Sequence, residues 1–235
     1  QLDPTQALGD YFETYVERDV RQLSEVRNLA AFERFVRLVA GRAGQLVNAS
    51  SLGSDAGVSH TTASEWLSLL EASFVIFRLP PYFANLKKRL VKSPKIYFID
   101  VGLAAYLLGI ESPSQLYSHP LRGALFENLV ISEAVKMRYN QGKKASNLYF
   151  YRDSGGLEVD LLISRAHELL PVEIKSSATL SKSFFQGLGK LTALLEDQVL
   201  GRLLVHDGDA TFQQRDTTVT HPKAFVKTAK SLLEA

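Results

Sequence analysis

Three charged side chains lie on segments that otherwise have the composition of buried strands. Glu173 and Lys175 belong to the apolar run 169–175, and Asp160 belongs to the run 157–163. Successive strand residues point to opposite faces of a sheet, so Glu173 and Lys175 share one face. Burying such a charge without a partner is unfavourable by several kcal/mol. Their placement therefore predicts a functional site rather than ordinary core.

The chemistry of this set favours metal-dependent hydrolysis. If the two segments are neighbouring strands, the carboxylates of Asp160 and Glu173 can reach one hard divalent cation, with Lys175 beside it. Mg²⁺ is typically held by one or two carboxylates, together with waters and a substrate phosphate. A bound cation lowers the pKa of its water, and a lysine can orient or deprotonate that water. The set predicts phosphodiester hydrolysis with Mg²⁺, or Mn²⁺ in its place, bound by Asp160 and Glu173.

Two further polar residues are candidates for the same centre. Glu127 lies in a predicted helix over 121–139, with Ala124 and Val130 as apolar neighbours at helical spacing. Gln186 lies near the start of the next predicted helix after Lys175 and can contact the centre or a substrate phosphate. The alternative for Gln186 is an ordinary amide on a helix surface. For the Glu-x-Lys pair taken alone, the alternative is a solvated ion pair.

The elements around these residues are expected in the order helix, three strands, helix, strand, helix. Hydrophobic periodicity predicts helices over 121–139, 181–196 and 222–233, and strands over 148–151, 157–163, 169–175 and 202–206. This order predicts an α/β (α+β) domain with a central mixed sheet. A connection that starts at Ser112-Pro113 places the domain boundary there. We therefore expect one domain over residues 1–112 and a second over residues 113–235.

The first 112 residues have the pattern of a helical, winged-helix domain. Two amphipathic helices are predicted between residues 8 and 38. A helix from about residue 50, a turn at Gly57-Val58-Ser59 and a helix over 62–70 form the helix-turn-helix layout. Two strands, over 74–79 and 96–99, would then form the wing.

Nucleic-acid contacts are expected from two places in this first domain. If residues 59–71 form a recognition helix, its groove-facing residues would be His60, Thr61, Ser64 and Ser68. The loop between the wing strands contains no acid, and its basic residues are Lys87, Lys88, Arg89, Lys92 and Lys95. Such a loop favours contact with DNA phosphates, and a merely solvated face is the alternative. No base-reading arginine pattern occurs, so we expect recognition of the backbone rather than of sequence.

Composition narrows the function classes. The 235 residues carry a net charge of only +2, so a polyanion-binding surface has to be local. The absence of cysteine excludes disulfides, thiolate metal sites and cysteine nucleophiles. No apolar stretch approaches the ~20 residues of a membrane span. We expect a cytoplasmic protein with no membrane partner, and the start at Gln1 suggests that upstream domains precede this chain.

Glu127, Asp160, Glu173 and Lys175 resemble, in type and order, the PD-(D/E)XK nuclease superfamily with its restriction-endonuclease-like fold. The stretches Gly-Ala-Leu-Phe-Glu-Asn-Leu-Val (123–130) and Lys-Ile-Tyr-Phe-Ile-Asp-Val-Gly-Leu (95–103) narrow the likeness. Together they look like an uncharacterised C-terminal domain family fused to AAA+-type P-loop ATPases, mostly in bacteria and archaea. The likeness runs from about Tyr11 to about Leu195. One departure is Lys190, where many RecB-like nucleases have tyrosine four residues after the glutamine.

The resemblance implies a nucleotide motor upstream of this chain. No Gly-x-x-x-x-Gly-Lys-Ser/Thr motif occurs in the 235 residues, so ATP would act only through an upstream domain. Three functions stay open at this point. The first is a Mg²⁺-dependent DNA nuclease positioned by its winged helix, and the second is a catalytically silent DNA- or protein-binding module that regulates the ATPase. The third is a role in a toxin–antitoxin or defence system.

Overall fold

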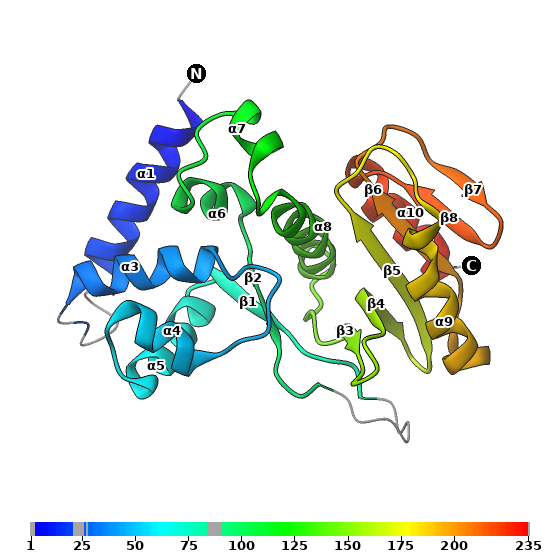
Figure 1. Ribbon diagram of the computed structural model, residues 1–235, viewed down its shortest axis with the longest axis horizontal. Coiled ribbons are helices and arrows are strands. Elements are labelled where there is room, and N and C mark those ends of the chain that lie inside the picture. The colour runs from blue at the N-terminus through cyan, green and yellow to red at the C-terminus, as the bar shows by residue number, and fades with distance from the viewer. Residues whose placement is uncertain (1–2, 21–25, 27, 84–90, 235) are drawn as a thin grey trace. The chain divides into compact units, whose positions relative to one another are not determined.

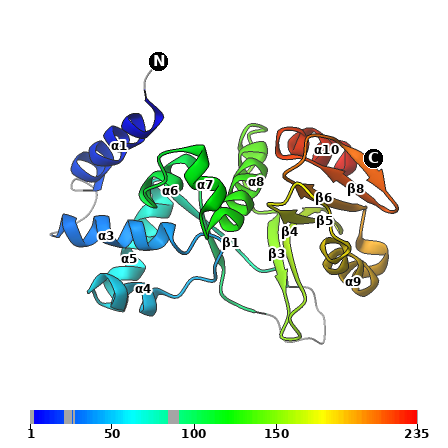
Figure 2. The same ribbon diagram turned by 45° about the horizontal axis from the view of Figure 1, so that its top comes forward.

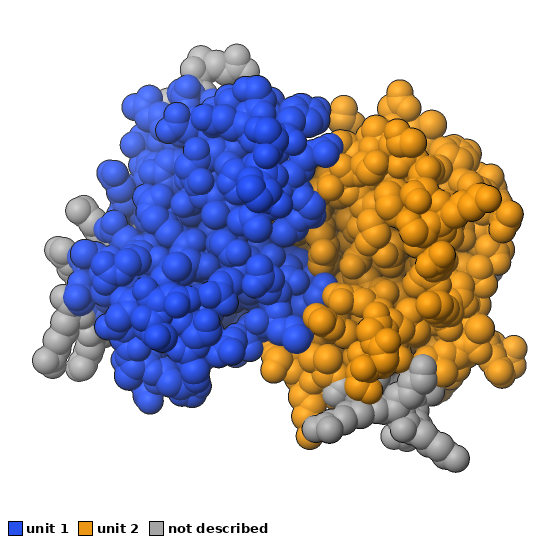
Figure 3. All heavy atoms as spheres, in the orientation of Figure 1, with its two compact units in different colours: residues 1–78, 95–125 blue, residues 79–94, 126–235 orange. Residues whose placement is uncertain are grey.

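The computed structural model describes residues 3–20, 26, 28–83 and 91–234. The chain forms two compact units, one made of residues 1–78 and 95–125 and the other of residues 79–94 and 126–235 (Figure 3). The first unit is mainly helical, and the second contains a six-stranded mixed sheet. The predicted α/β class, with a helical part followed by a sheet domain, is confirmed. The boundary at 112/113 stays a prediction.

Helices account for most of the first unit. They are α1 (Pro4–Thr14), the π-helix η1 (Tyr15–Val20), α3 (Leu29–Ala40), α4 (Ala49–Ala56), α5 (His60–Ala72), α6 (Val101–Leu107) and α7 (Pro113–Ser118). Phe32 and Phe35 of α3 contact Trp66 of α5 edge-to-face, with ring centroids 5.2 and 5.3 Å apart. This aromatic cluster lies in the core of the unit, as the apolar periodicity of the two helices requires.

Helices α4 and α5 are joined by the predicted glycine turn. Gly57 ends α4 in the left-handed conformation at φ 75°, and Ser59 caps α5 by accepting a hydrogen bond from the Thr62 amide. A Cβ added to Gly53 would lie 2.9 Å from the carbonyl oxygen of Val58. The two helices approach each other this closely because position 53 has no side chain. The helix, turn and helix expected from the sequence are therefore confirmed.

Two short strands follow the helical pair. β1 (Ile76–Leu79) and β2 (Lys95–Phe98) form a two-stranded sheet. The sequence suggested that Lys95 belongs to the basic loop, but the structure places it outside that loop. It begins β2, is only 3% exposed and forms a bridge with Leu46. The expectation that Lys95 contacts DNA is therefore wrong, because its side chain is buried.

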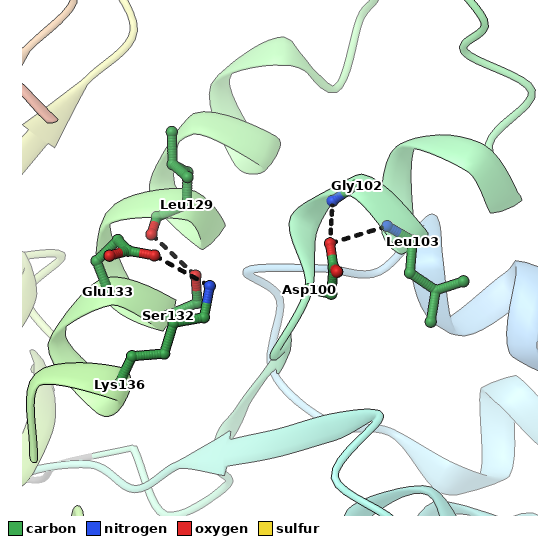
Figure 4. A network of polar contacts seen from close by, with 7 residues as sticks. All are labelled: Asp100, Gly102, Leu103, Leu129, Ser132, Glu133 and Lys136. Atoms are coloured by element: carbon green, nitrogen blue, oxygen red, sulfur yellow. Dashed lines mark hydrogen bonds and ion pairs between the residues drawn. The ribbon is translucent and has the colours of Figure 1, made fainter. Parts of the chain in front are cut away.

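Polar side chains at the start of α6 and within helix α8 (Arg122–Tyr139) have partners nearby in sequence (Figure 4). Asp100 caps α6, its Oδ1 accepting hydrogen bonds from the amides of Gly102 at 2.7 Å and Leu103 at 3.3 Å. In helix α8, which begins in the first unit and continues into the second, Ser132 donates to the Leu129 carbonyl. The carboxylate of Asp100 thus has a structural role as the N-cap of α6.

The second unit is built on the mixed sheet (Figure 1). Its strands, in spatial order, are β3 (Leu148–Arg152), β4 (Glu158–Arg165), β5 (Glu168–Lys175), β6 (Arg202–His206), β8 (Thr217–Thr220) and β7 (Phe212–Gln214). β3, β4 and β5 are antiparallel neighbours, whereas β5, β6 and β8 run parallel. β7 closes the sheet by pairing antiparallel with β8. The first four strands were predicted, and the last two were not.

Helices cover both faces of this sheet. After a short 3-10 turn, η2 (Lys182–Phe185), helix α9 (Gln186–Leu195) packs against β4 and β5. A second 3-10 turn, η3 (Glu196–Gln198), leads into β6, and α10 (Pro222–Glu234) packs against β5, β6 and β8. Figure 2 shows α9 and α10 on opposite faces. None of the described helices combines the length and apolarity needed to cross a bilayer.

The outer edge of β3 is hydrogen-bonded to three residues that lie between β1 and β2, namely Pro80, Tyr82 and Val91. The Tyr82 amide donates to the Phe150 carbonyl at 2.7 Å, and the Phe150 amide donates to the Pro80 carbonyl at 3.0 Å. The Val91 amide adds a bond to the Arg152 carbonyl at 3.2 Å. These bonds satisfy backbone groups that an edge strand would otherwise expose. The described residues on either side of 84–90 thus extend the hydrogen bonding of the second unit's sheet beyond β3.

Candidate functional site

The sheet brings three of the predicted site residues together on β4 and β5. Leu161 pairs with Val172, so the antiparallel register places Asp160 opposite Glu173. The Nζ of Lys175 lies 2.6 Å from Oε1 of Glu173 and 3.5 Å from Oδ2 of Asp160. One ammonium therefore contacts two carboxylates from neighbouring strands.

Asp160 and Glu173 are both buried acids, with 7% and 8% of their surface exposed. The Ile174 amide donates to Asp160 Oδ2 at 2.8 Å, which fixes this carboxylate against β5. Glu173 is held less completely: its Oε2 is buried and has no hydrogen-bond partner among the described residues. A buried oxygen without a partner is unfavourable, so this one marks a position where a proton or a ligand would be accommodated.

The electrostatic surroundings change the pKa values of the cluster. Burial, followed by the charge of Asp160, raises the pKa of Glu173 from 4.5 to about 8, and Lys175 opposes that rise. Burial by itself would lower the pKa of Lys175, but Asp160 and Glu173 together raise it above 10.5. Lys175 therefore stays charged at neutral pH, and Glu173 binds a proton more readily than an ordinary carboxyl group.

Glu127 is the second residue of α8 that belongs to the sheet unit, and it is half-buried. Its charge adds to the rise in the pKa of Glu173, so the two carboxylates lie within electrostatic range. Asp160, Lys175 and Glu127 thus all affect the pKa of Glu173. The structure places Gln186 at the first residue of α9, exposed and lining a cavity that also contains Glu173.

This cavity has a volume of about 620 Å³ and lies between α9 and the β3–β4 turn. On the helix side its lining residues are Ser183, Gln186, Gly187, Lys190, Ala193 and Leu194, and on the other side they are Asp153, Gly155, Gly156, Leu157 and Glu158. Glu173 of β5 also lines it. The size is within the range of small-molecule and cofactor sites.

Gly187 is a residue of this site that the sequence analysis did not identify. A Cβ at Gly187 would lie 3.0 Å from the Glu158 carbonyl oxygen and 3.4 Å from Glu173 Oε2. The helix can lie this close to the two strands only because position 187 has no side chain. The signal in the sequence was the Gly-Leu-Gly that directly follows Gln186, but a glycine alone does not reveal its contacts.

His206 is a second residue for which no role was predicted. It ends β6, where the parallel register pairs it with Lys175. It is 5% exposed, and neither ring nitrogen has a hydrogen-bond partner within the described residues. A Cβ at Gly208 would come within van der Waals overlap of this ring. A scattered histidine carries no such information in sequence, because the register that places it beside Lys175 is a tertiary feature.

The donor set suits a hard cation. Across the described ranges, no group of three or more His, Cys, Asp and Glu side chains is arranged to bind a metal. Asp160 and Glu173 offer two carboxylates, and Mg²⁺ is commonly held by two or fewer, with water and phosphate completing its shell. Of these carboxylate oxygens, Oε2 of Glu173 is buried and has no hydrogen-bond partner among the described residues. These residues therefore fit Mg²⁺, which keeps several water ligands, better than an ion whose ligands all come from the protein.

The residues predicted to contact DNA lie in several environments. His60, Thr61 and Ser68 are exposed on α5, whereas Ser64 is half-buried and its carbonyl accepts a bond from Ser68. Lys92 is exposed, and Lys95 is buried as described above. The remaining basic residues of the loop, Lys87, Lys88 and Arg89, lie outside the described residues.

The chain is similar to known sequence families in both of its parts. Two family models match it. Residues 2–114 match "Domain of unknown function (DUF8612)", and residues 122–225 match "Domain of unknown function (DUF4143)". The second match contains Glu127, Asp160, Glu173 and Lys175, and the predicted boundary at 112/113 lies close to the gap between the two matches.

Full-length relatives carry no description of function. The chain is 32% identical over 225 residues to an "Uncharacterized protein" of Mycobacterium tuberculosis and to one of Mycobacterium bovis, covering 95% of the chain and 49% of each relative. It is 25% identical over 174 residues to an "Uncharacterized protein" of Haemophilus influenzae, covering 71% of the chain and 39% of that relative. The chain thus spans about half the length, or less, of the curated relatives it matches.

Proposed function

We propose that the second unit is a Mg²⁺-dependent nuclease-like domain that hydrolyses phosphodiesters of DNA. The observation that carries this proposal is the contact of one ammonium, that of Lys175, with two buried carboxylates on adjacent strands. Helix, three strands, helix and strand occur in the order of the PD-(D/E)XK superfamily, with Glu127 on the helix and Asp160 on the second strand. Residue types, order and geometry therefore support the same chemistry.

Each residue has a distinct role in this proposal. Asp160 and Glu173 would bind the cation, and Glu127 would add negative charge beside Glu173. When bound, Mg²⁺ would lower the pKa of a coordinated water and stabilise charge on the attacked phosphate. Lys175 keeps its proton while both carboxylates face it. It is therefore suited to orient the water or to donate a hydrogen bond to a phosphate oxygen, rather than to act first as a base.

Cleavage of DNA by the purified chain tests the proposal. Wild-type protein with Mg²⁺, or with Mn²⁺ in its place, is expected to nick plasmid DNA, and Lys175→Ala is expected to abolish nicking. Lys182→Ala is a matched control, since Lys182 is exposed on η2 and does not line the cavity. A circular dichroism spectrum establishes that each variant is folded. Nicking that persists in folded Lys175→Ala would overturn the assignment.

We further propose that this chain is part of a longer protein that also contains an ATPase domain. We propose an upstream AAA+-type P-loop ATPase, because residues 95–103 and 123–130 resemble a domain family fused to such ATPases. The curated relatives, about twice as long as the chain, have room for such a domain. In that arrangement ATP binds only the upstream domain, and α5 with the basic loop contacts DNA phosphates. Under this proposal, DNA-stimulated ATP hydrolysis is expected in a relative of full length.

One observation favours a second function, a catalytically silent DNA- or protein-binding module that regulates the ATPase. Lys175 already forms ion pairs with Asp160 and Glu173, so the cluster can be stable without supporting hydrolysis. Salt-sensitive DNA binding without cleavage in Mg²⁺ or Mn²⁺ would favour this function. Binding that does not respond to replacement of Lys87, Lys88 and Arg89 would indicate a protein partner.

A further inference from the structure

The face of α9 that lines the cavity presents a regular series of side chains. Ser183, Gln186, Lys190 and Leu194 follow one another at intervals of three or four residues, so they lie on one side of the helical segment. Gln186 and Lys190 are one turn apart, with Cβ atoms about 5–6 Å from each other. Both side chains are exposed, and Glu173 lines the same cavity.

Lys190 is the only basic residue among those that line this cavity in the described structure. The acids on the opposite side have local partners. Asp153 Oδ1 accepts from the amides of Gly155 at 2.8 Å and Leu157 at 3.1 Å, and Glu158 forms an ion pair with Arg152 at 3.6 Å. No hydrogen bond or ion pair of Lys190 occurs within the described residues. Its ammonium is thus available to an anion.

One feature indicates that a ligand belongs in the cavity, and a second leaves room for it. The first is Glu173, more than nine-tenths buried, whose Oε2 has no partner in the described part of the chain. The second is the turn opposite Lys190, where Gly156 has φ 84° and a Cβ added there would meet no atom within 4 Å. The turn therefore leaves space for a ligand beside its backbone.

We propose that Lys190, supported by Gln186, binds a backbone phosphate of the nucleic-acid strand next to the phosphate that is hydrolysed. This inference rests on the proposed nuclease function and adds a substrate-positioning residue to it. Lys190 is suited to the task because an ammonium binds phosphate as a point charge without fixed orientation. Leu157 and Leu194 at the same cavity offer apolar contact to the attached sugar or base.

The phosphate contact of Lys190 is tested by measuring DNA binding under conditions that prevent cleavage. Fluorescence anisotropy of a labelled single-stranded DNA oligonucleotide, with the whole chain in EDTA and at several salt concentrations, measures it. Lys190→Gln is expected to lower the binding constant roughly five- to tenfold at low salt, and to reduce the slope of log K against log[salt] by about 0.7. Lys190→Arg is expected to preserve most of the affinity, because it keeps the charge.

Lys182→Gln is the matched control, because it removes the same charge from an exposed site on the neighbouring turn outside the cavity. An unchanged slope in Lys190→Gln, or an equal loss in Lys182→Gln, would overturn the inference. So would the absence of oligonucleotide binding by the wild type. If Lys190→Gln alone weakens binding but the wild type does not cleave in Mg²⁺ or Mn²⁺, the nuclease proposal fails while the phosphate contact stands.

Discussion

Lys175 Nζ lies 2.6 Å from Glu173 Oε1, and this ion pair joins residues two positions apart on one face of β5. The same ammonium reaches Asp160 on β4 at 3.5 Å. The pair keeps the pKa of Glu173 lower than burial and Asp160 alone would make it, yet that pKa is still about 8. The cluster therefore holds a proton that is exchanged close to neutral pH.

The titration of Glu173 should make folding stability depend on pH. Its pKa is about 8 in the folded chain and about 4.5 when unfolded, so the folded state binds the proton more tightly. This contribution is fully present below pH 4.5 and is lost as pH rises through 8, with a slope of at most about 1.4 kcal/mol per pH unit. Urea unfolding of wild type and Glu173→Gln across this range measures it. The free energy of unfolding of the wild type minus that of Glu173→Gln should decrease as pH rises. A difference that stays constant with pH would contradict the raised pKa of Glu173.

Mg²⁺ should stabilise the folded chain more at alkaline than at acid pH, because the metal and the proton compete for Glu173. A saturating ion at one hundred times its Kd would add about 2.7 kcal/mol. Differential scanning fluorimetry with and without Mg²⁺ at pH 6 and pH 9 tests this, and the Tm shift should be larger at pH 9. Asp160→Asn and Glu173→Gln should remove most of the shift. Equal shifts at both pH values would rule out Glu173 as a ligand.

Gly187 and Gly189 offer a matched pair on α9. Gly187→Ala places a Cβ 3.0 Å from the Glu158 carbonyl oxygen, so we expect a loss of about 1–3 kcal/mol of stability and of any cleavage activity. Gly189→Ala meets no atom within 4 Å and should instead stabilise the helix by about 0.5–1 kcal/mol. Denaturant unfolding compares the two. Similar effects at both positions would mean that the helix does not lie against Glu173 as described.

In the first unit, a side chain at position 53 should reduce stability as much as one at position 187. Gly53→Ala puts a Cβ 2.9 Å from the Val58 carbonyl oxygen and 3.3 Å from Ala63 Cβ, so α4 and α5 would have to separate. We expect a loss of about 1–3 kcal/mol, measured by thermal unfolding. Ser54→Ala, on an exposed neighbour, is the control and should change stability little. A neutral Gly53→Ala would show that the helical pair can rearrange.

The sequence predicted the elements that carry strong periodicity and missed those that do not. β4 and β5 were identified from apolar runs interrupted by Asp160 and Glu173. β8 was missed because Thr217 and Thr220 look like loop residues, although both are buried. Hydroxyl contacts make this burial favourable, as between Thr220 and Thr211 at 2.8 Å. Such partners come from tertiary pairing, which one-dimensional patterns do not contain.

The site was predictable to a similar degree. Residue types and order were sufficient to select Glu127, Asp160, Glu173 and Lys175, because charges on apolar segments stand out. The roles of Gly187 and His206 depend on how α9 and β6 lie against β5, and no local pattern encodes those contacts. Lys95 was misplaced because a run of basic residues resembles a solvated loop. Lys95, the last lysine of that run, is the first residue of the buried strand β2.

The hydrogen bonds of Pro80, Tyr82 and Val91 with β3 have a practical consequence for dissecting this protein. The peptide chain passes from one unit to the other at 78/79, at 94/95 and again at 125/126, so neither unit is a single continuous stretch. A fragment beginning at residue 113 would keep all six strands of the large sheet but would lack the bonds from Tyr82 and Val91 to β3. Its bare edge would be open to pairing with another copy, which favours association and aggregation. Experiments on this protein should therefore change single residues in the intact chain rather than cut it.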